Sequence, residues 1–181
     1  ITVAAWVRTT ADGGTILSFD NNNYYSLGLS NGRAQFASTA GTATVSNVSY
    51  NINNGQWHLV VATFGSSEFN IYVDGVLALN QAAGNTTIGT GITRYGMIGA
   101  LPWSDQFGTW SYLGNFFNGQ IAEVGIWDGA TLTQADVTAM FTNGISTLGG
   151  ATDHWMLNDL PVEVSPSSPA VFTDVVNGAS V

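Results

Sequence analysis

Apolar and polar side chains alternate along much of this chain with a period of two residues. The stretch Trp57–Phe64 (WHLVVATF) shows the pattern most strongly, and Phe69–Val73 repeats it after a short turn. Asp74-Gly75 follows, and an Asp-Gly pair between two such runs favours a tight hairpin because both turn positions need positive φ. The pattern therefore predicts neighbouring antiparallel strands, each with one buried face.

Similar segments recur along the chain and are separated by turns rich in Gly, Asn and Asp; Asn31-Gly32 is a second hairpin signal. Strands at intervals of roughly 8–12 residues, with turn signals between them, are typical of an antiparallel sandwich of two sheets. We therefore predict an all-β fold. The predicted strands are Ile1–Thr9, Thr15–Phe19, Tyr24–Leu29, Arg33–Ala37, Thr42–Val48, Trp57–Phe64, Phe69–Val73, Gly75–Gln81, Tyr95–Ala100 and Gly119–Trp127.

A helix is predicted at Thr133–Thr142, near the C-terminus. Thr133 precedes Asp136 by three residues, which resembles a capping box at the start of a helix. An apolar stripe follows, and Asn143-Gly144 then favours termination. The stripe consists of Leu132, Val137, Met140 and Phe141.

The composition fits one domain with a packed core. The chain has 181 residues, of which 45% are hydrophobic and 22 are glycine. It contains no cysteine, which excludes disulfides and cysteine-ligated zinc.

The charge excludes several classes of partner. The sequence has 3 Arg, no Lys and 12 acidic residues, for a formal net charge of −9. So few cations cannot neutralise a phosphate backbone, which excludes nucleic acid as a ligand and disfavours anionic membrane surfaces. No apolar run approaches the ~18 residues of a membrane span, so membrane insertion is not expected either.

Several segments together resemble a known family. ITVAAWVRT, NNGQWHLVVATF, FNIYVDGVLA and NGQIAEVGIWDGATLTQADV occur in the order found in laminin-G-like, concanavalin A-like jelly-roll domains of the pentraxin type, and the resemblance covers about residues 1–145. It implies an all-β, two-sheet antiparallel jelly-roll sandwich with one short helix near the C-terminus. It also implies binding of carbohydrates or proteins, frequently with calcium, by modules of extracellular, cell-surface or viral proteins.

The two ends of the chain depart from the family pattern. Segments that family members carry before the first strand occur here at the end, as residues 154–159 (HWMLND) and 172–178 (FTDVVNG). We therefore divide the chain into a jelly-roll sandwich at residues 1–150 and an extended segment at 151–181. That segment either closes the same domain or begins a second repeat. We favour closure, which predicts that Trp155 and Leu157 are buried against the domain's own sheet.

The sequence shows no catalytic constellation, and we predict a non-enzyme. Glucanases with a related sandwich fold place two carboxylates a few residues apart on one strand, whereas Glu123 has no acidic partner at that spacing. His58 and His154 have no Ser–Asp or metal-ligand pattern around them. For His58, at the start of a strand, we expect instead that the ring faces a loop or forms a structural hydrogen bond.

Calcium is a candidate cofactor because the resemblance implies a site for it. The corresponding residues here are Glu123, Asp174, Asn177 and Gly178, which offer carboxylate and carbonyl oxygens. Ala122 replaces one acidic position of the family's pattern. The Asp20–Asn23 cluster is a second candidate, although such clusters between strands are usually turns.

The loop Leu101–Phe116 is the candidate ligand-binding region. Its exposed rings would stack on sugars, and its polar side chains would bond hydroxyl groups. Two alternatives remain open: the rings form a small satellite core, or they form a protein interface. The candidate ligand contacts are Trp103, Asp105, Trp110, Tyr112 and Asn115.

Tryptophans inside strands are predicted to belong to the core. They are Trp6, Trp57 and Trp127.

Two functions follow as hypotheses. The first is a non-catalytic recognition module on an extracellular, cell or virion surface, which binds a glycan or a surface protein in carbohydrate binding or adhesion. The second is a structural assembly subunit, such as a phage capsid decoration, a fibre or a surface-layer protein, with no sugar ligand. Either is compatible with a homo-oligomer or a place in a larger assembly.

Overall fold

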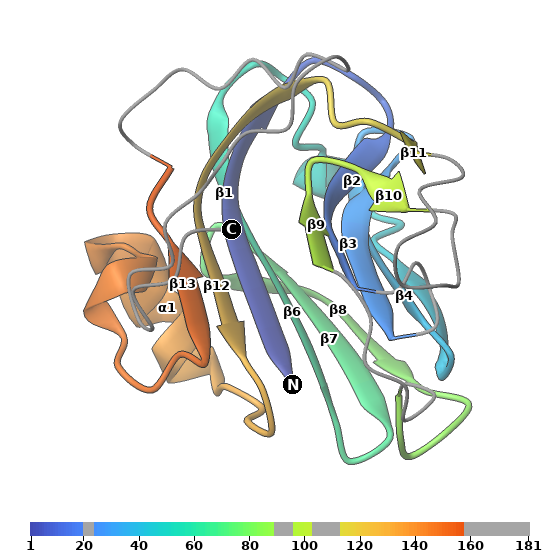
Figure 1. Cartoon of the computed structure of the whole chain (residues 1–181), viewed down its shortest axis with the longest axis vertical. Helices are drawn as coiled ribbons and strands as arrows, with labels where there is room; N and C mark the ends of the chain where they lie inside the picture. Colours follow the sequence, from blue (N-terminus) through green and yellow to red (C-terminus); the bar gives the residue numbers. More distant parts are fainter. Residues whose placement is uncertain (20–23, 89–95, 103–112, 158–181) are drawn as a thin grey trace.

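Two antiparallel sheets face each other across a hydrophobic core in the computed structural model of the chain (Figure 1). The structure describes residues 1–19, 24–88, 96–102 and 113–157. The predicted two-sheet jelly-roll sandwich is confirmed. The Asp20–Asn23 cluster, the second calcium candidate, lies outside the described residues and stays a prediction.

The first sheet has six strands in the order β13-β12-β1-β6-β7-β8, and every neighbouring pair is antiparallel. The predicted hairpin through Asp74-Gly75 joins β7 to β8, and both turn residues have positive φ (51° and 80°). The strands are β1 (Thr2–Thr9), β6 (Trp57–Gly65), β7 (Glu68–Val73), β8 (Val76–Ala82), β12 (Gly119–Trp127) and β13 (Asp153–Trp155).

The second sheet has five strands in the order β5-β4-β3-β2-β9. The predicted strand Thr42–Val48 was too long, because the strand ends at Thr44 and a 3₁₀ turn, η1 (Val48–Tyr50), follows it. The predicted irregular loop Leu101–Phe116 begins and ends with a small strand pair, β10 (Leu101–Pro102) and β11 (Leu113–Gly114). The strands are β2 (Gly14–Phe19), β3 (Tyr25–Ser30), β4 (Arg33–Ser38), β5 (Gly41–Thr44) and β9 (Gly96–Ile98).

Alternation along the strands builds the core between the sheets. Val3, Ala5 and Val7 of β1 all point inward and are fully buried. Phe36 of the second sheet meets Phe69 of the first at 5.8 Å between ring centroids, in an edge-to-face arrangement. Aromatic and branched side chains therefore hold the two sheets together.

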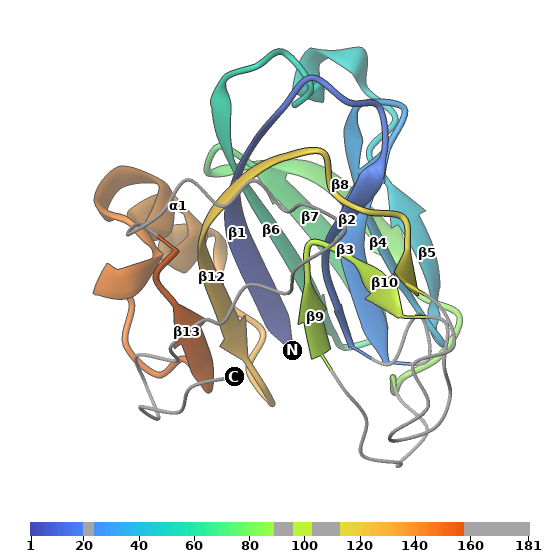
Figure 2. The ribbon, with the colours of Figure 1, turned by 45° about the horizontal axis from the view of Figure 1, so that its top comes forward.

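The helix α1 (Gln134–Asn143) packs on the outer face of the six-stranded sheet, away from the five-stranded sheet (Figure 2). The predicted capping box is confirmed, because Thr133 is the N-cap and its side chain accepts the Asp136 N–H. Two hydrogen bonds from Thr133 hold the pKa of the Asp136 carboxyl below its usual value. Of the predicted apolar stripe, Val137 and Met140 are fully buried, whereas Phe141 is exposed.

The segment after the helix returns to the same sandwich. A short 3₁₀ turn, η2 (Ile145–Thr147), leads to β13, which pairs with β12 through Val124 opposite Trp155. Leu157 is buried in the core between the sheets, and the half-buried Trp155 packs against that core. Residues 153–157 are therefore part of this sandwich, and residues 158–181 lie outside the described part.

In the described ranges, no helix is long and apolar enough to cross a membrane.

Candidate ligand-binding surface

Helix α1 covers only part of the outer face of the six-stranded sheet. Ala4 of β1 and Leu59 of β6 lie beneath it, in one buried cluster with Val137 and Met140. Trp6 lies at the rim of this cluster and is half-buried. The part of the face beyond Trp6 is where large side chains reach the surface.

Trp57 lies on that uncovered part, and the prediction that it belongs to the core was wrong. It is 42% exposed, although it begins a strand as expected. Trp57 pairs with Arg8 and shares its face with Leu59, two residues along β6. The helix packs over Leu59 but does not extend over Trp57.

Two more rings extend the surface. Trp6 stacks on Phe141 of the helix, with ring centroids 5.8 Å apart and an angle of 22° between the planes. Phe141 is 41% exposed. Trp6 pairs with Leu59, so Trp57, two residues before Leu59 on β6, is the diagonal neighbour of Trp6. Diagonal neighbours in a sheet lie about 7–8 Å apart. We call Trp6, Trp57 and Phe141 the outer aromatic patch.

Polar side chains border the patch. Arg8 is exposed, and its Nε donates to the Gly55 carbonyl oxygen at 2.8 Å, which fixes the direction of the guanidinium group. Arg8 pairs with Trp57 on one side and with Gln120 of β12 on the other, and Gln120 is half-buried. Directly paired residues point to the same face of a sheet, so the guanidinium, the amide and Trp57 share one surface.

A hydrogen-bonded bend leads into Trp57. Gly55 donates its N–H to the Thr9 carbonyl at 2.9 Å, and the Asn54 side-chain oxygen accepts the Gln56 N–H at 2.8 Å. His58 then joins the bend to the next hairpin. Its Nδ1 lies 2.8 Å from Asp74 Oδ2, and its Nε2 lies 3.0 Å from Asn54 Oδ1. The prediction of a structural hydrogen bond for His58 is therefore confirmed.

The predicted loop site is described only at its end. Trp103, Asp105, Trp110 and Tyr112 lie outside the described residues, so their roles stay predictions. Asn115 is described, and it ties β11 to β2: its carbonyl accepts the Thr15 N–H and its Nδ2 donates to Thr15 Oγ1, both at 2.8 Å. Its backbone has positive φ (51°).

Glu123 of the predicted calcium site lies at an irregularity of β12. Its φ is 45°, and the register between β1 and β12 shifts beside it. Its Oε2 accepts the Ile145 N–H at 3.2 Å, so the carboxylate holds η2 against the sheet. Asp174, Asn177 and Gly178 lie outside the described residues. Within the described ranges no group of three His, Cys, Asp or Glu could hold a metal, and the calcium site stays a prediction.

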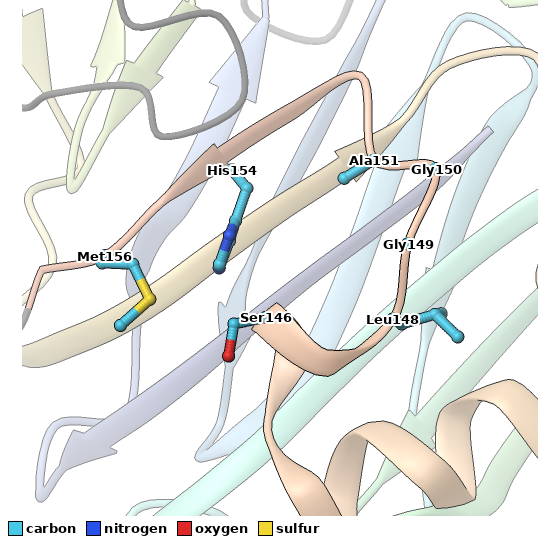
Figure 3. A pocket seen from close by; sticks show the side chains of 7 residues that line it. All are labelled: Ser146, Leu148, Gly149, Gly150, Ala151, His154 and Met156. Carbon is cyan, nitrogen blue, oxygen red and sulfur yellow. The ribbon is translucent and has the colours of Figure 1, made fainter.

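A hollow of about 390 Å³ lies between η2 and β13 (Figure 3). His154, which is 6% exposed, points toward Ser146 across it. The rest of the lining is apolar side chain or glycine, so the hollow offers few groups that would recognise a polar ligand. The lining residues are Ser146, Leu148, Gly149, Gly150, Ala151, His154 and Met156.

Comparison with known proteins identifies the fold family. The family model of the concanavalin A-like lectin/glucanases superfamily (Laminin_G_3) matches residues 1–138. A search of curated proteins found no match.

Solved structures with the same fold include three informative ones. A Bacteroides ovatus protein, whose assignment as carbohydrate-binding is provisional, has a TM-score of 0.72 at 15% identity over 99% of this chain and 50% of its own. A heptameric pentraxin from Limulus polyphemus has a TM-score of 0.60 at 19% identity over 80% and 70%. Domain 4 of a Geobacillus stearothermophilus extracellular arabinanase, in complex with arabinotriose, has a TM-score of 0.52 at 19% sequence identity. That match covers 77% of this chain and 65% of the arabinanase domain's chain. The present chain spans half the length of the Bacteroides protein.

Proposed function

This chain belongs to the concanavalin A-like lectin/glucanases superfamily, and from that premise we propose that it is a non-catalytic carbohydrate-binding domain. We propose further that the sugar stacks on the outer aromatic patch. One observation carries this assignment: Trp57 is 42% exposed on β6, at the position that pairs with the exposed Arg8 of β1.

The chemistry of the patch suits a sugar ring. A pyranose or furanose presents a C–H face that an indole can cover and a rim of hydroxyl groups that need hydrogen bonds. Trp57 offers the aromatic face, while Arg8 donates from its remaining N–H groups and Gln120 both donates and accepts. Neighbouring exposed apolar rings also mark binding surfaces in general.

The patch exists before any ligand arrives. Trp57 and Arg8 are paired positions of two hydrogen-bonded strands, and the Arg8 side chain is held by Gly55. Trp6 is fixed by its stack on Phe141. Binding would therefore order few side chains, which preserves affinity.

Two of the related structures are consistent with carbohydrate as the proposed ligand class. The arabinanase domain was solved with arabinotriose, and the Bacteroides protein is provisionally described as carbohydrate-binding. At 15% and 19% identity they show the fold of this chain. An extracellular or cell-surface setting is part of the same proposal, as is assembly into a homo-oligomer.

Two predicted regions remain as additional proposals. The loop tryptophans Trp103 and Trp110 would form a second contact for a longer glycan. Calcium would be held by Glu123 with Asp174 and the Asn177 and Gly178 carbonyl oxygens, which are hard oxygen donors.

The test is a glycan array and a polysaccharide pull-down with the purified chain, run with and without a chelator. Trp57→Ala should abolish binding without unfolding the domain. Phe116→Ala is the matched control, because Phe116 is also aromatic and 38% exposed but lies beside β2, away from the patch. Loss in the Phe116 variant alone would move the site toward the predicted loop.

A complete null with stable oligomers in solution would favour the structural assembly subunit instead. Chelator-sensitive binding would support the calcium proposal, and binding that the chelator leaves unchanged would contradict it.

A further inference from the structure

We infer that His58 is a positioning residue for the outer aromatic patch and that its doubly protonated ring holds the patch in its binding geometry. The inference rests on the proposed function, because the patch is the proposed sugar site. Its basis is the placement of the ring between two hydrogen-bond acceptors.

Both ring nitrogens of His58 face oxygen atoms that can only accept. Nδ1 lies 2.8 Å from Asp74 Oδ2, and Nε2 lies 3.0 Å from Asn54 Oδ1. Because Asn54 Oδ1 also accepts the Gln56 N–H at 2.8 Å, the amide oxygen, and not its nitrogen, faces the ring. A neutral imidazole has a single N–H, so only the imidazolium form donates to both partners.

When the His58 ring loses one proton, we expect it to keep its hydrogen bond to Asp74 and to lose the one to Asn54. Asp74 is fixed in place, because its Oδ1 accepts the Leu59 N–H at 3.0 Å and its own N–H donates to the Leu59 carbonyl at 2.9 Å. Hydrogen bonds to a carboxylate are stronger than bonds to an amide oxygen. Loss of the second proton therefore breaks the bond to Asn54 and keeps the bond to Asp74.

Asn54 opens the bend that carries the patch. The next residue, Gly55, bonds β1 through the Thr9 carbonyl and holds Arg8 through its own carbonyl. Gly55 has a φ of 78°, which favours glycine and keeps the bend tight. Without the His58 contact, Asn54 keeps its bond from the Gln56 N–H but is no longer tied to the β7–β8 turn. We infer that this loosens the contact that directs Arg8 and the backbone that leads into Trp57.

Among the described residues, few charged groups lie near the ring. Asp74, on the β7–β8 turn, makes the direct contact. The Asp12 carboxylate accepts a hydrogen bond from Asn53 Nδ2 at 2.8 Å, and Arg8 donates to the Gly55 carbonyl. Both charged groups therefore bond residues next to Asn54, and no bond to the ring itself is described for them. On the paired strand, the residue opposite His58 is the apolar Val7. Among these groups, only the Asp74 carboxylate bonds the ring directly.

The first experiment follows the free protein, which keeps it independent of any ligand. Amide hydrogen-exchange protection of residues 54–57, corrected for intrinsic rates, is measured between about pH 5 and 9, together with the ¹⁵N shifts of the His58 ring. Loss of the hydrogen bond from the imidazolium to Asn54 should reduce protection roughly tenfold or more as the pH rises. Protection that is constant while the ring titrates would overturn the inference.

Matched variants assign the effect. His58→Gln should remove the pH dependence of the bend. His154→Gln, which changes the chain's other histidine, should retain it. A pH dependence that persists in His58→Gln would also overturn the inference.

The second experiment uses the best-retained oligosaccharide from the array, or arabinotriose if none stands out. The affinity of the wild type should fall roughly three- to tenfold as the pH rises over the same range. The affinity of His58→Gln should not change with pH. An affinity that is equally flat in the wild type would contradict the coupling. Absence of all sugar binding with a pH-sensitive bend would refute the proposed function but leave the role of His58 in the bend intact.

Discussion

Two tryptophans beside opposite ends of β1 show how differently the two ends of one sheet face are covered. Trp127 pairs with Thr2 and Trp57 pairs with Arg8, and both point to the outer face of the six-stranded sheet. Trp127 is 1% exposed under the helix region, whereas Trp57 is 42% exposed. Both tryptophans lie on the same face, on strands that pair with β1, so the difference lies in what covers each ring.

The covered end behaves as a second hydrophobic core. Trp127 donates its indole N–H to the Gly149 carbonyl at 3.3 Å and packs with Val137 and Met140. Burial in the same cluster raises the pKa of the Tyr72 hydroxyl above its usual value. At the other end the strands continue and the helix does not, so the apolar face there is left exposed.

The largest expected effect concerns the covered end. Trp127→Ala should destabilise the domain by about 3–5 kcal/mol, because a fully buried ring leaves a cavity and an unsatisfied partner. Chemical denaturation of the variant against wild type measures this. A loss below about 1 kcal/mol would mean that the helix region closes over the gap or is not packed as described.

The helix cap should matter less than the buried ring. Thr133→Ala removes the N-cap of α1 and should lower the free energy of unfolding by about 1 kcal/mol. Urea denaturation of this variant and of Thr142→Ala, at the other end of the helix, provides the comparison. Equal losses in the two variants would show that the capping box contributes nothing specific.

Acid should weaken the same cap. The pKa of Asp136 is lowered in the folded protein, so its contribution is fully present above the unfolded-state value and is lost as the pH falls through the folded-state value. The stability difference between wild type and Asp136→Asn should therefore shrink below about pH 4. A difference that stays constant down to pH 2 would contradict the assigned hydrogen bonds.

The smallest effect on stability belongs to the uncovered end. Trp57→Ala should change the free energy of unfolding by less than about 1 kcal/mol, because the ring already contacts water. Calorimetric melting temperatures of this variant and of Trp127→Ala make the comparison direct. A loss as large as that of Trp127→Ala would return Trp57 to the core.

The sequence predicts the strands and the helix cap well, because both depend on local patterns. The capping box at Thr133 and the hairpin at Asp74-Gly75 appear where expected. Alternation also identifies Trp57 and Trp127 as members of strands. It does not reveal where a helix distant in sequence ends on that sheet, so the exposure of Trp57 was missed.

The candidate site was harder to predict for the same reason. Arg8, Gln120 and Trp57 come from three strands, and only the sheet order brings them to one surface. One signal was available: Arg8 follows Trp6 by two residues on a strand, which places a cation and an indole on one face. The loop and calcium predictions fall largely on residues outside the described part.

The most direct test compares all six tryptophans at once. Indole ¹H–¹⁵N signals, assigned through single substitutions, are recorded while the best-retained glycan is titrated into the protein. The account predicts that the signals of Trp57 and Trp6 shift and saturate, while that of Trp127 does not move. Shifts confined to Trp103 and Trp110, with Trp57 unchanged, would contradict it.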